Sequence, residues 1–296
     1  MGGVEGGGTK FKLLLGTGPD DILDEAGFPT TTPEETLGRV IEFFRRPRAD
    51  TKLVAVGFAS FGPIDLNPAS PTYGYITTTP KVGWSSTNVV GMLRSALDVP
   101  VGWDTDVTAA ALGERRWGAG RDTENLVYLT VGTGIGGGAI VDGRPIHGLL
   151  HPEMGHLLLP RLEGDTFPGV CPYHGDCLEG LASGPALHQR LGRPAEDIAP
   201  DDPVWEMEAY YLAAGLHNIG HVLSPQRIIV GGGVAGTAGL LQRVRKHVVQ
   251  LNQGYLAHPA LSREIDSYIM PPGLGSHSGA LGALELAGQA LRDASG

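Results

Sequence analysis

The chain has 296 residues, of which 41% are hydrophobic, so it is long enough for two domains and whole-chain disorder is excluded. Its 46 glycines and 22 prolines follow no collagen period, which predicts a globular fold rich in tight loops. The net charge of −10 argues against nucleic-acid binding through a basic surface, but it allows a local anion site built from backbone N–H groups.

Taken in chain order, apolar runs alternate with helical periodicities. The first part predicts a strand–turn–strand over 4–16, a helix over 33–46, a strand over 53–59, a functional loop over 62–83, a helix over 88–97, a strand over 99–103, a turn over 104–106 and a helix over 107–113. The second part predicts a strand–turn–strand over 125–143, a loop over 147–180, a helix over 205–223, a strand, glycine turn and helix over 227–236, and a final helix over 278–294. This alternation favours an α/β fold.

The repeated strand–turn–strand pattern predicts two lobes. We place the first at residues 1–118 and the second at 119–279, with a helix at about 280–294 returning to the first. The N-terminus lacks the charged and apolar regions of a signal peptide, and no stretch reaches about 18 apolar residues. We therefore expect a cytoplasmic protein without a membrane partner.

Three glycine clusters each follow an apolar strand. They are Gly6-Gly7-Gly8-Thr9, Gly132-Thr133-Gly134-Ile135-Gly136-Gly137 and Gly231-Gly232-Gly233. Glycine lets backbone N–H groups approach an anion closely, and the two threonine hydroxyls add donors. The second cluster matches G-x-G-x-x-G, but a strand follows it, so a dinucleotide fingerprint is rejected. Any one cluster could be an ordinary hairpin turn, whereas the three together favour phosphate binding.

The two cysteines predict a metal site. Cys171, His174 and Cys177 have C-x₂-H-x₂-C spacing, which suits tetrahedral Zn²⁺. The fourth ligand is open among three nearby histidines, His147, His151 and His156. The alternative is a pair of free cysteines beside a surface histidine.

Carboxylates at three places are candidates for chemistry or for ordinary structure. Asp104 and Asp106 flank Thr105 before a predicted helix, where an aspartate is also a favoured N-cap. Glu153 and Glu179 could bind a polyol through directional hydrogen bonds, or could be solvated surface groups.

Six motifs carry a resemblance to a known family. GGGTK at 6–10, TDVTAAALGE at 105–114, LTVGTGIGGG at 129–138, HPEMGH at 151–156, CPYHGDCLEG at 171–180 and IIVGGGV at 228–234 resemble the ROK family of sugar kinases. The loop at 70–84 resembles its bacterial fructokinase branch. The resemblance implies an actin-like, hexokinase-type (ribonuclease H-like) fold with ATP and sugar in the cleft between two lobes. It also implies ATP-dependent phosphorylation of a hexose, D-fructose to fructose 6-phosphate, by a homodimer.

The resemblance assigns roles to matching positions. It makes Asp106 the catalytic base and Asp104 a structural neighbour, and it makes His156 the fourth ligand of a structural Zn²⁺. The implied sugar contacts are Glu153, His156, Glu179, Gly62, Pro63 and Thr105. The implied ATP contacts are Gly7, Gly8, Thr9, Lys10, Gly132, Thr133, Gly134, Gly231, Gly232 and Gly233.

The chain departs from the family pattern at three positions. The family often has Asn where Thr105 and Thr108 stand, and Glu5 replaces a more usual Asp, which leaves its part in Mg²⁺ binding open. A kinase for glucose, mannose or an amino sugar is the alternative. A sugar-sensing repressor is disfavoured, because such proteins carry a DNA-binding segment ahead of the first glycine motif.

Overall fold

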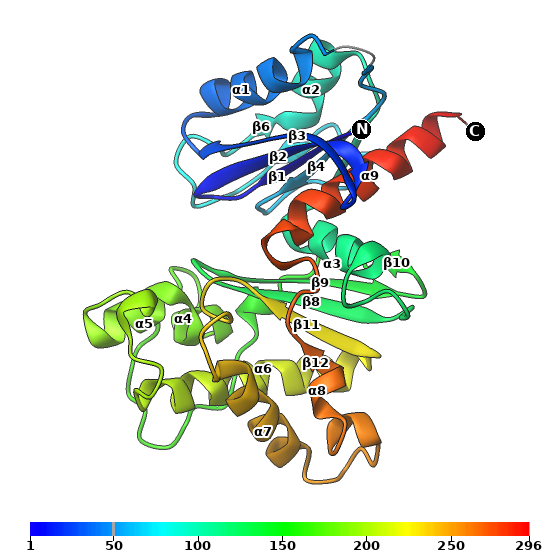
Figure 1. The fold of residues 1–296 in the computed structure, drawn as a ribbon. Coiled ribbons are helices and arrows are strands. Elements are labelled where there is room, and N and C mark those ends of the chain that lie inside the picture. The colour runs from blue at the N-terminus through cyan, green and yellow to red at the C-terminus, as the bar shows by residue number, and fades with distance from the viewer. Residues whose placement is uncertain (49–50, 296) are drawn as a thin grey trace. The chain divides into compact units, whose positions relative to one another are not determined.

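The computed structural model describes residues 1–48 and 51–295, which form two compact units. Unit 1 comprises Met1–Arg121, Pro145–Pro152 and Ser276–Gly296, and unit 2 comprises Asp122–Arg144 and Glu153–Gly275. Figure 1 labels most helices and strands of both units. The segment 145–152 was expected in the second lobe and clusters with unit 1, where two of its histidines form hydrogen bonds. The assignment of 1–118 and 119–279 as lobes stays a prediction.

Unit 1 is built on a five-stranded sheet. Its strand order is β3-β2-β1-β4-β7, formed by β1 (Gly2–Gly6), β2 (Lys10–Gly18), β3 (Asp21–Pro29), β4 (Val56–Ser60) and β7 (Val101–Thr105). The first three strands pair antiparallel, and β1, β4 and β7 are parallel. The other elements are α1 (Pro33–Arg45), α2 (Val89–Leu97), α3 (Asp106–Trp117), α9 (Ser278–Ser295) and the short strands β5 (Tyr75–Ile76) and β6 (Thr87–Asn88).

Helices cover both faces of this sheet (Figure 1). On one face, α1 and α2 bury apolar side chains such as Leu37 and Leu93 against Val4 and Phe58 of the strands. On the other face α9 packs on β1, β4 and β7. The predicted helix over 33–46 forms because its apolar residues recur at helical spacing, and the Thr32 hydroxyl caps it.

A row of glycines lets α9 approach the sheet backbone. Gly3, Gly57 and Gly102 are register partners on β1, β4 and β7. A Cβ atom on Gly57 would overlap the carbonyl oxygen of Ala283, and one on Gly102 would overlap that of Leu286. Any larger side chain in this row therefore forces the helix away from the sheet.

Unit 2 has a second five-stranded sheet, of order β10-β9-β8-β11-β12. Its strands are β8 (Leu126–Val131), β9 (Ile135–Val141), β10 (Arg144–Pro145), β11 (Arg227–Gly231) and β12 (Ile269–Met270). Its helices are α4 (Leu178–Ala182), α5 (Gly184–Leu191), α6 (Val204–Leu223), α7 (Leu240–Asn252) and α8 (Ile265–Tyr268). Single 3₁₀ turns lie at Met154–His156, Ala195–Asp197, Pro259–Leu261 and Gly275–His277.

The structure confirms the α/β class and both strand–turn–strand units, and it corrects three details. Strand β3 was not predicted, because most of its side chains are at least partly exposed and carry no apolar run. The strand expected to end at Trp103 continues to Thr105, so no turn separates β7 from α3. The helix expected directly after the third glycine cluster begins only at Leu240. In the described residues, no helix combines the length and apolar character that crossing a bilayer requires.

Candidate active site

The sequence around Asp106 forms a strand-to-helix junction in unit 1. Thr105 is the N-cap of α3, because its hydroxyl accepts from Thr108 N at 3.1 Å and lies 2.8 Å from the Thr108 hydroxyl. The reading of an aspartate as the cap is therefore wrong. Asp106 is the first helical residue, is partly exposed, and accepts from Val107 N at 2.9 Å. Its carboxylate is thus fixed at the helix start, where N–H groups favour negative charge.

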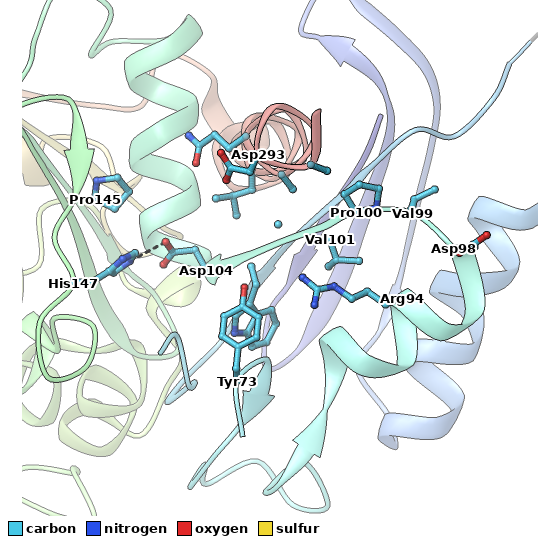
Figure 2. A pocket seen from close by; sticks show the side chains of 16 residues that line it. Tyr73, Arg94, Asp98, Val99, Pro100, Val101, Asp104, Pro145, His147 and Asp293 are labelled. Atoms are coloured by element: carbon cyan, nitrogen blue, oxygen red, sulfur yellow. Dashed lines mark ion pairs between the residues drawn. The ribbon is translucent and has the colours of Figure 1, made fainter. Parts of the chain in front are cut away.

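Asp104 is buried and takes a different set of partners. One carboxylate oxygen accepts from Thr105 N at 2.7 Å, and the other lies 2.9 Å from His147 Nε2. This hydrogen bond raises the pKa of His147. Both residues line a pocket of about 810 Å³ in unit 1, and Figure 2 shows the two side chains meeting there. Asp106 is not among the residues that line it.

The predicted sugar-contacting turn at Gly62 and Pro63 is held at two points within unit 1. The Pro63 carbonyl accepts from Thr77 N at 2.9 Å. On the other side Ile64 N donates to His151 Nε2 at 3.1 Å. Neither His147 nor His151, both considered as zinc ligands, lies in the cysteine cluster.

That cluster consists of His156, Cys171, His174 and Cys177 in unit 2, with all donor atoms within 4.8 Å of one another. The Sγ–Nδ1 distances are 3.7 Å for Cys171 to either histidine and 3.5 Å for Cys177 to His156. Zn–S and Zn–N bonds of about 2.3 and 2.1 Å place tetrahedral S and N ligands about 3.6 Å apart. The residues therefore fit a zinc ion, and no disulfide joins the cysteines.

The cysteine cluster leads directly into Glu179. Cys177 precedes α4, whose first residue, Leu178, donates its N–H to Leu157 O at 2.8 Å. Glu179 lies in the first turn of this helix and accepts from Ile135 N at 2.9 Å. Burial and the nearby charge of Glu179 raise the pKa of Glu153 to about 7. The Glu179 carboxylate is therefore close enough to affect the ionisation of Glu153.

The second and third glycine clusters come together in unit 2. The turn Gly132–Gly134 joins β8 to β9, and Val234 N donates to Val131 O at 3.0 Å. Gly132, Thr133 and Gly233 line a pocket of about 1050 Å³, with α5 residues such as Pro185 and His188. Of the predicted ATP contacts, Gly134, Gly231 and Gly232 adjoin this pocket without lining it. No sequence motif had indicated the α5 residues.

The first glycine cluster forms the β1–β2 hairpin of unit 1, closed by Gly7 N donating to Lys10 O at 3.0 Å. Glu5 lies in β1, one residue before its end, and its side chain is beside Gly279 at the start of α9. Its Oε2 lies 3.8 Å from Lys12 Nζ and has no hydrogen-bond partner among the described residues. Burial raises the pKa of Glu5. An orphaned carboxylate oxygen of this kind fits a role in binding a cation such as Mg²⁺.

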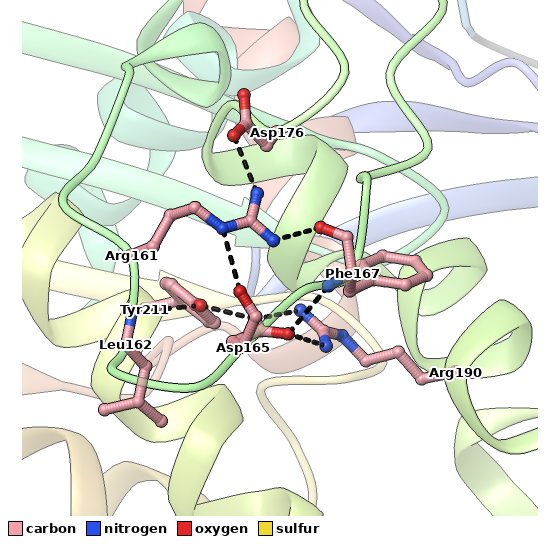
Figure 3. Close-up of polar contacts among 7 residues, drawn as sticks. All are labelled: Arg161, Leu162, Asp165, Phe167, Asp176, Arg190 and Tyr211. Carbon is pink, nitrogen blue, oxygen red and sulfur yellow. Dashed lines mark hydrogen bonds and ion pairs between the residues drawn. The ribbon is translucent and has the colours of Figure 1, made fainter.

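A partly buried polar cluster that the sequence did not reveal holds the loop that carries Cys171 and His174 (Figure 3). Arg190 donates to both oxygens of Asp165 at 2.9 and 2.8 Å, and the Tyr211 hydroxyl donates to Asp165 at 2.5 Å. Arg161 bonds Asp176 at 2.7 Å, next to Cys177. The Arg190 and Tyr211 bonds hold the pKa of Asp165 well below its usual range.

Comparison with known proteins assigns this chain to a family. The model of the ROK family matches residues 1–290. A putative fructokinase of Bacillus subtilis is 45% identical over 99% of this chain and 96% of its own length. The fructokinase of Pediococcus pentosaceus is 43% identical over 99% of both chains.

A solved structure agrees with these relatives. The ROK glucokinase of Streptomyces griseus, in complex with glucose and AMPPNP, superimposes with a TM-score of 0.78 at 26% identity, covering 98% of this chain and 99% of that one. This likeness confirms the actin-like, hexokinase-type fold. The chain therefore belongs to the ROK family.

Proposed function

We propose that this protein is an ATP-dependent fructokinase, which transfers the γ-phosphoryl group of ATP to O6 of D-fructose. The full-length identity of 43–45% to proteins named fructokinase or putative fructokinase carries this proposal. The geometry of each unit supports it, since unit 1 presents a fixed carboxylate at Asp106 and unit 2 has a pocket between two glycine turns.

Asp106 supplies the base. Its carboxylate takes the proton of the sugar hydroxyl while that oxygen attacks the γ-phosphorus, so the O–P bond forms as the bond to ADP breaks. When Mg²⁺ is bound it neutralises phosphate charge. Glu5 would help to hold it, because its Oε2 has no hydrogen-bond partner in the described part of the chain.

Sugar binding falls to Glu153, His156 and Glu179. Carboxylates accept hydrogen bonds from hydroxyls, and an imidazole nitrogen donates or accepts one. His156 Nδ1 faces the two cysteine sulfurs, so zinc would bind there and leave Nε2 for a sugar hydroxyl. Zinc would then orient His156, and through Cys177 the helix that carries Glu179. From the family resemblance we also retain the predicted contacts of Gly62, Pro63 and Thr105 with the sugar.

The nucleotide binds through the glycine turns, and replacing Thr133 tests this assignment. Thr133 is exposed and lines the pocket, so Thr133→Val removes a phosphate donor and keeps the shape. We expect KM for ATP to rise about tenfold while KM for fructose stays within about twofold, since a lost hydrogen bond to a charged group costs about 1.5–3 kcal/mol. Thr166→Val, also exposed but outside the pocket, is the control. Equal changes in both KM values contradict the phosphate role.

Zinc content gives a second test. We expect about one zinc per chain in protein purified without chelator, and a loss of most of it in Cys177→Ser, because ligation requires a deprotonated thiol. Fructose affinity should fall before ATP affinity, since Glu179 follows Cys177 closely. The control is Ser262→Cys added to Cys177→Ser, which returns a thiol to an exposed position of unit 2 without rebuilding the cluster. Less than half an equivalent of zinc in the parent, or unchanged zinc in Cys177→Ser, rejects the site.

The activity itself is tested by measuring ADP release over a panel of fructose, glucose, mannose and glucosamine. We expect the highest kcat/KM with fructose. Preference for another hexose would support the alternative kinase, since the solved relative binds glucose. If none of these sugars causes ADP release, the result would support a sugar-binding protein without catalytic activity. Homodimer formation stays a prediction, which sedimentation can check.

A further inference from the structure

The segment Pro145–Pro152 belongs to unit 1 although it begins at the last residue of β10, a strand of the sheet of unit 2. Its middle protrudes, since the Leu149 side chain is 98% exposed and that of Leu150 is 57% exposed. Its two histidines, by contrast, turn inward to fixed partners in unit 1. The two histidines therefore connect an exposed loop to the sheet and the Gly62–Ile64 turn of unit 1.

The first contact acts beside the proposed base. His147 Nε2 lies 2.9 Å from Asp104, and Asp104 in turn accepts from Thr105 N. Thr105 caps the helix that Asp106 begins. The His147 side chain is 38% exposed while that of Asp104 is 3% exposed, so His147 satisfies the second oxygen of a carboxylate that is withdrawn from water.

The second contact acts at the proposed sugar turn. His151 is 7% exposed and its Nε2 accepts from Ile64 N, the residue after Gly62-Pro63. To accept, Nε2 must be unprotonated, and burial lowers the pKa of His151 in agreement. The ring also packs on Gly62, where a Cβ would lie 3.2 Å from Cε1. His151 thus fixes the turn through a hydrogen bond and through contact.

We propose that Pro145–Pro152 is a histidine strap that positions two functional segments of unit 1. His147 positions the start of α3, where Asp106 lies, through Asp104. His151 positions the Gly62–Ile64 turn. Both histidines are positioning residues, because neither needs to touch the substrate. The inference rests on the proposed function, which assigns the start of α3 to catalysis and the Gly62–Ile64 turn to sugar binding.

The two histidines should differ in their kinetic effects. His151→Ala leaves the buried Ile64 N–H unpaired, so we expect KM for fructose to rise about tenfold with KM for ATP within about twofold. His151→Gln, whose amide oxygen can accept the same bond, should return to within about threefold of the parent. His147→Ala should lower kcat about tenfold with little change in KM, and His147→Gln, which can still donate, should restore most of it.

Hydrogen exchange tests the strap independently of catalytic activity. Hydrogen exchange at Ile64 N–H should quicken at least tenfold in His151→Ala and not in His147→Ala or in the exposed control His258→Ala. If the parent phosphorylates no hexose but this pattern of exchange holds, the proposed function fails and the strap stands as a structural device. The strap is rejected if the parent is active and, in all variants, kcat falls and KM rises in proportion to the loss of stability. It is also rejected if glutamine restores activity at neither position. Should His151→Ala fail to fold, His151→Asn replaces it, because its shorter amide does not reach Ile64.

Discussion

Replacing Asp106 with asparagine is expected to lower kcat for fructose phosphorylation by about 10²–10⁴, the usual loss when a general base is removed. Asparagine keeps the size of the side chain and can still accept from Val107 N, so α3 should begin as before. It cannot take the proton of the sugar hydroxyl. KM for ATP should stay within about twofold, and steady-state kinetics of ADP release measure both parameters.

A matched replacement elsewhere in unit 1 controls for the loss of a charge. Asp98 ends α2 with φ of 51°, a conformation that asparagine adopts readily. Asp98→Asn should therefore leave kcat and stability nearly unchanged. Turnover in Asp106→Asn within a few-fold of the parent would show that another group accepts the proton.

Replacing Asp165 with asparagine should have the largest effect on stability. The Asp165 and Arg190 side chains are 8% and 9% exposed, and breaking a buried pair typically costs about 3–5 kcal/mol of unfolding free energy. Asparagine leaves the Arg190 guanidinium with a neutral partner. Urea unfolding at pH 7 measures the difference. Asp266→Asn is the control, since Asp266 pairs with Arg245 at 2.9 Å but is 81% exposed, and surface pairs contribute about 0–1 kcal/mol.

The Asp165–Arg190 pair should also make the unfolding free energy depend on pH. The Asp165 pKa is lowered in the folded protein, so the folded state favours the carboxylate more than the unfolded state does. Its stabilisation is present above the unfolded pKa of about 4 and is lost as pH falls toward the folded value. The gap in unfolding free energy between parent and Asp165→Asn should therefore narrow below about pH 4. If the difference in unfolding free energy stays constant from pH 7 to pH 3, ionisation of Asp165 is not the source of the stabilisation.

The sequence predicted what depends on local spacing. Apolar periodicity gave α1, and C-x₂-H-x₂-C spacing identified three members of the metal cluster, because these residues lie in one short loop. It could not identify the partners of Asp165, since Arg190 and Tyr211 lie 25 and 46 residues away and only the fold brings them together.

The structure differs from the sequence-based prediction at two further places, where several side chains could fill the same role. Thr105, Asp104 and Asp106 all favour helix starts, and only the length of β7 decides that the threonine caps α3. His147 and His151 were plausible metal ligands by proximity in sequence. The return of their segment to unit 1 gives them Asp104 and Ile64 instead.

The glycine row beneath α9 has a consequence for protein synthesis. Gly3, Gly57 and Gly102 are synthesised before α9, the helix whose backbone packs against them. While the nascent chain lengthens through the whole of unit 2, one face of the N-terminal sheet lacks its cover and exposes apolar surface to water. Unit 2, whose segments are contiguous apart from 145–152, can fold on the ribosome first. We therefore expect a polypeptide stalled before Ser278 to bind chaperones through the sheet of unit 1, and synthesis of α9 to end that binding.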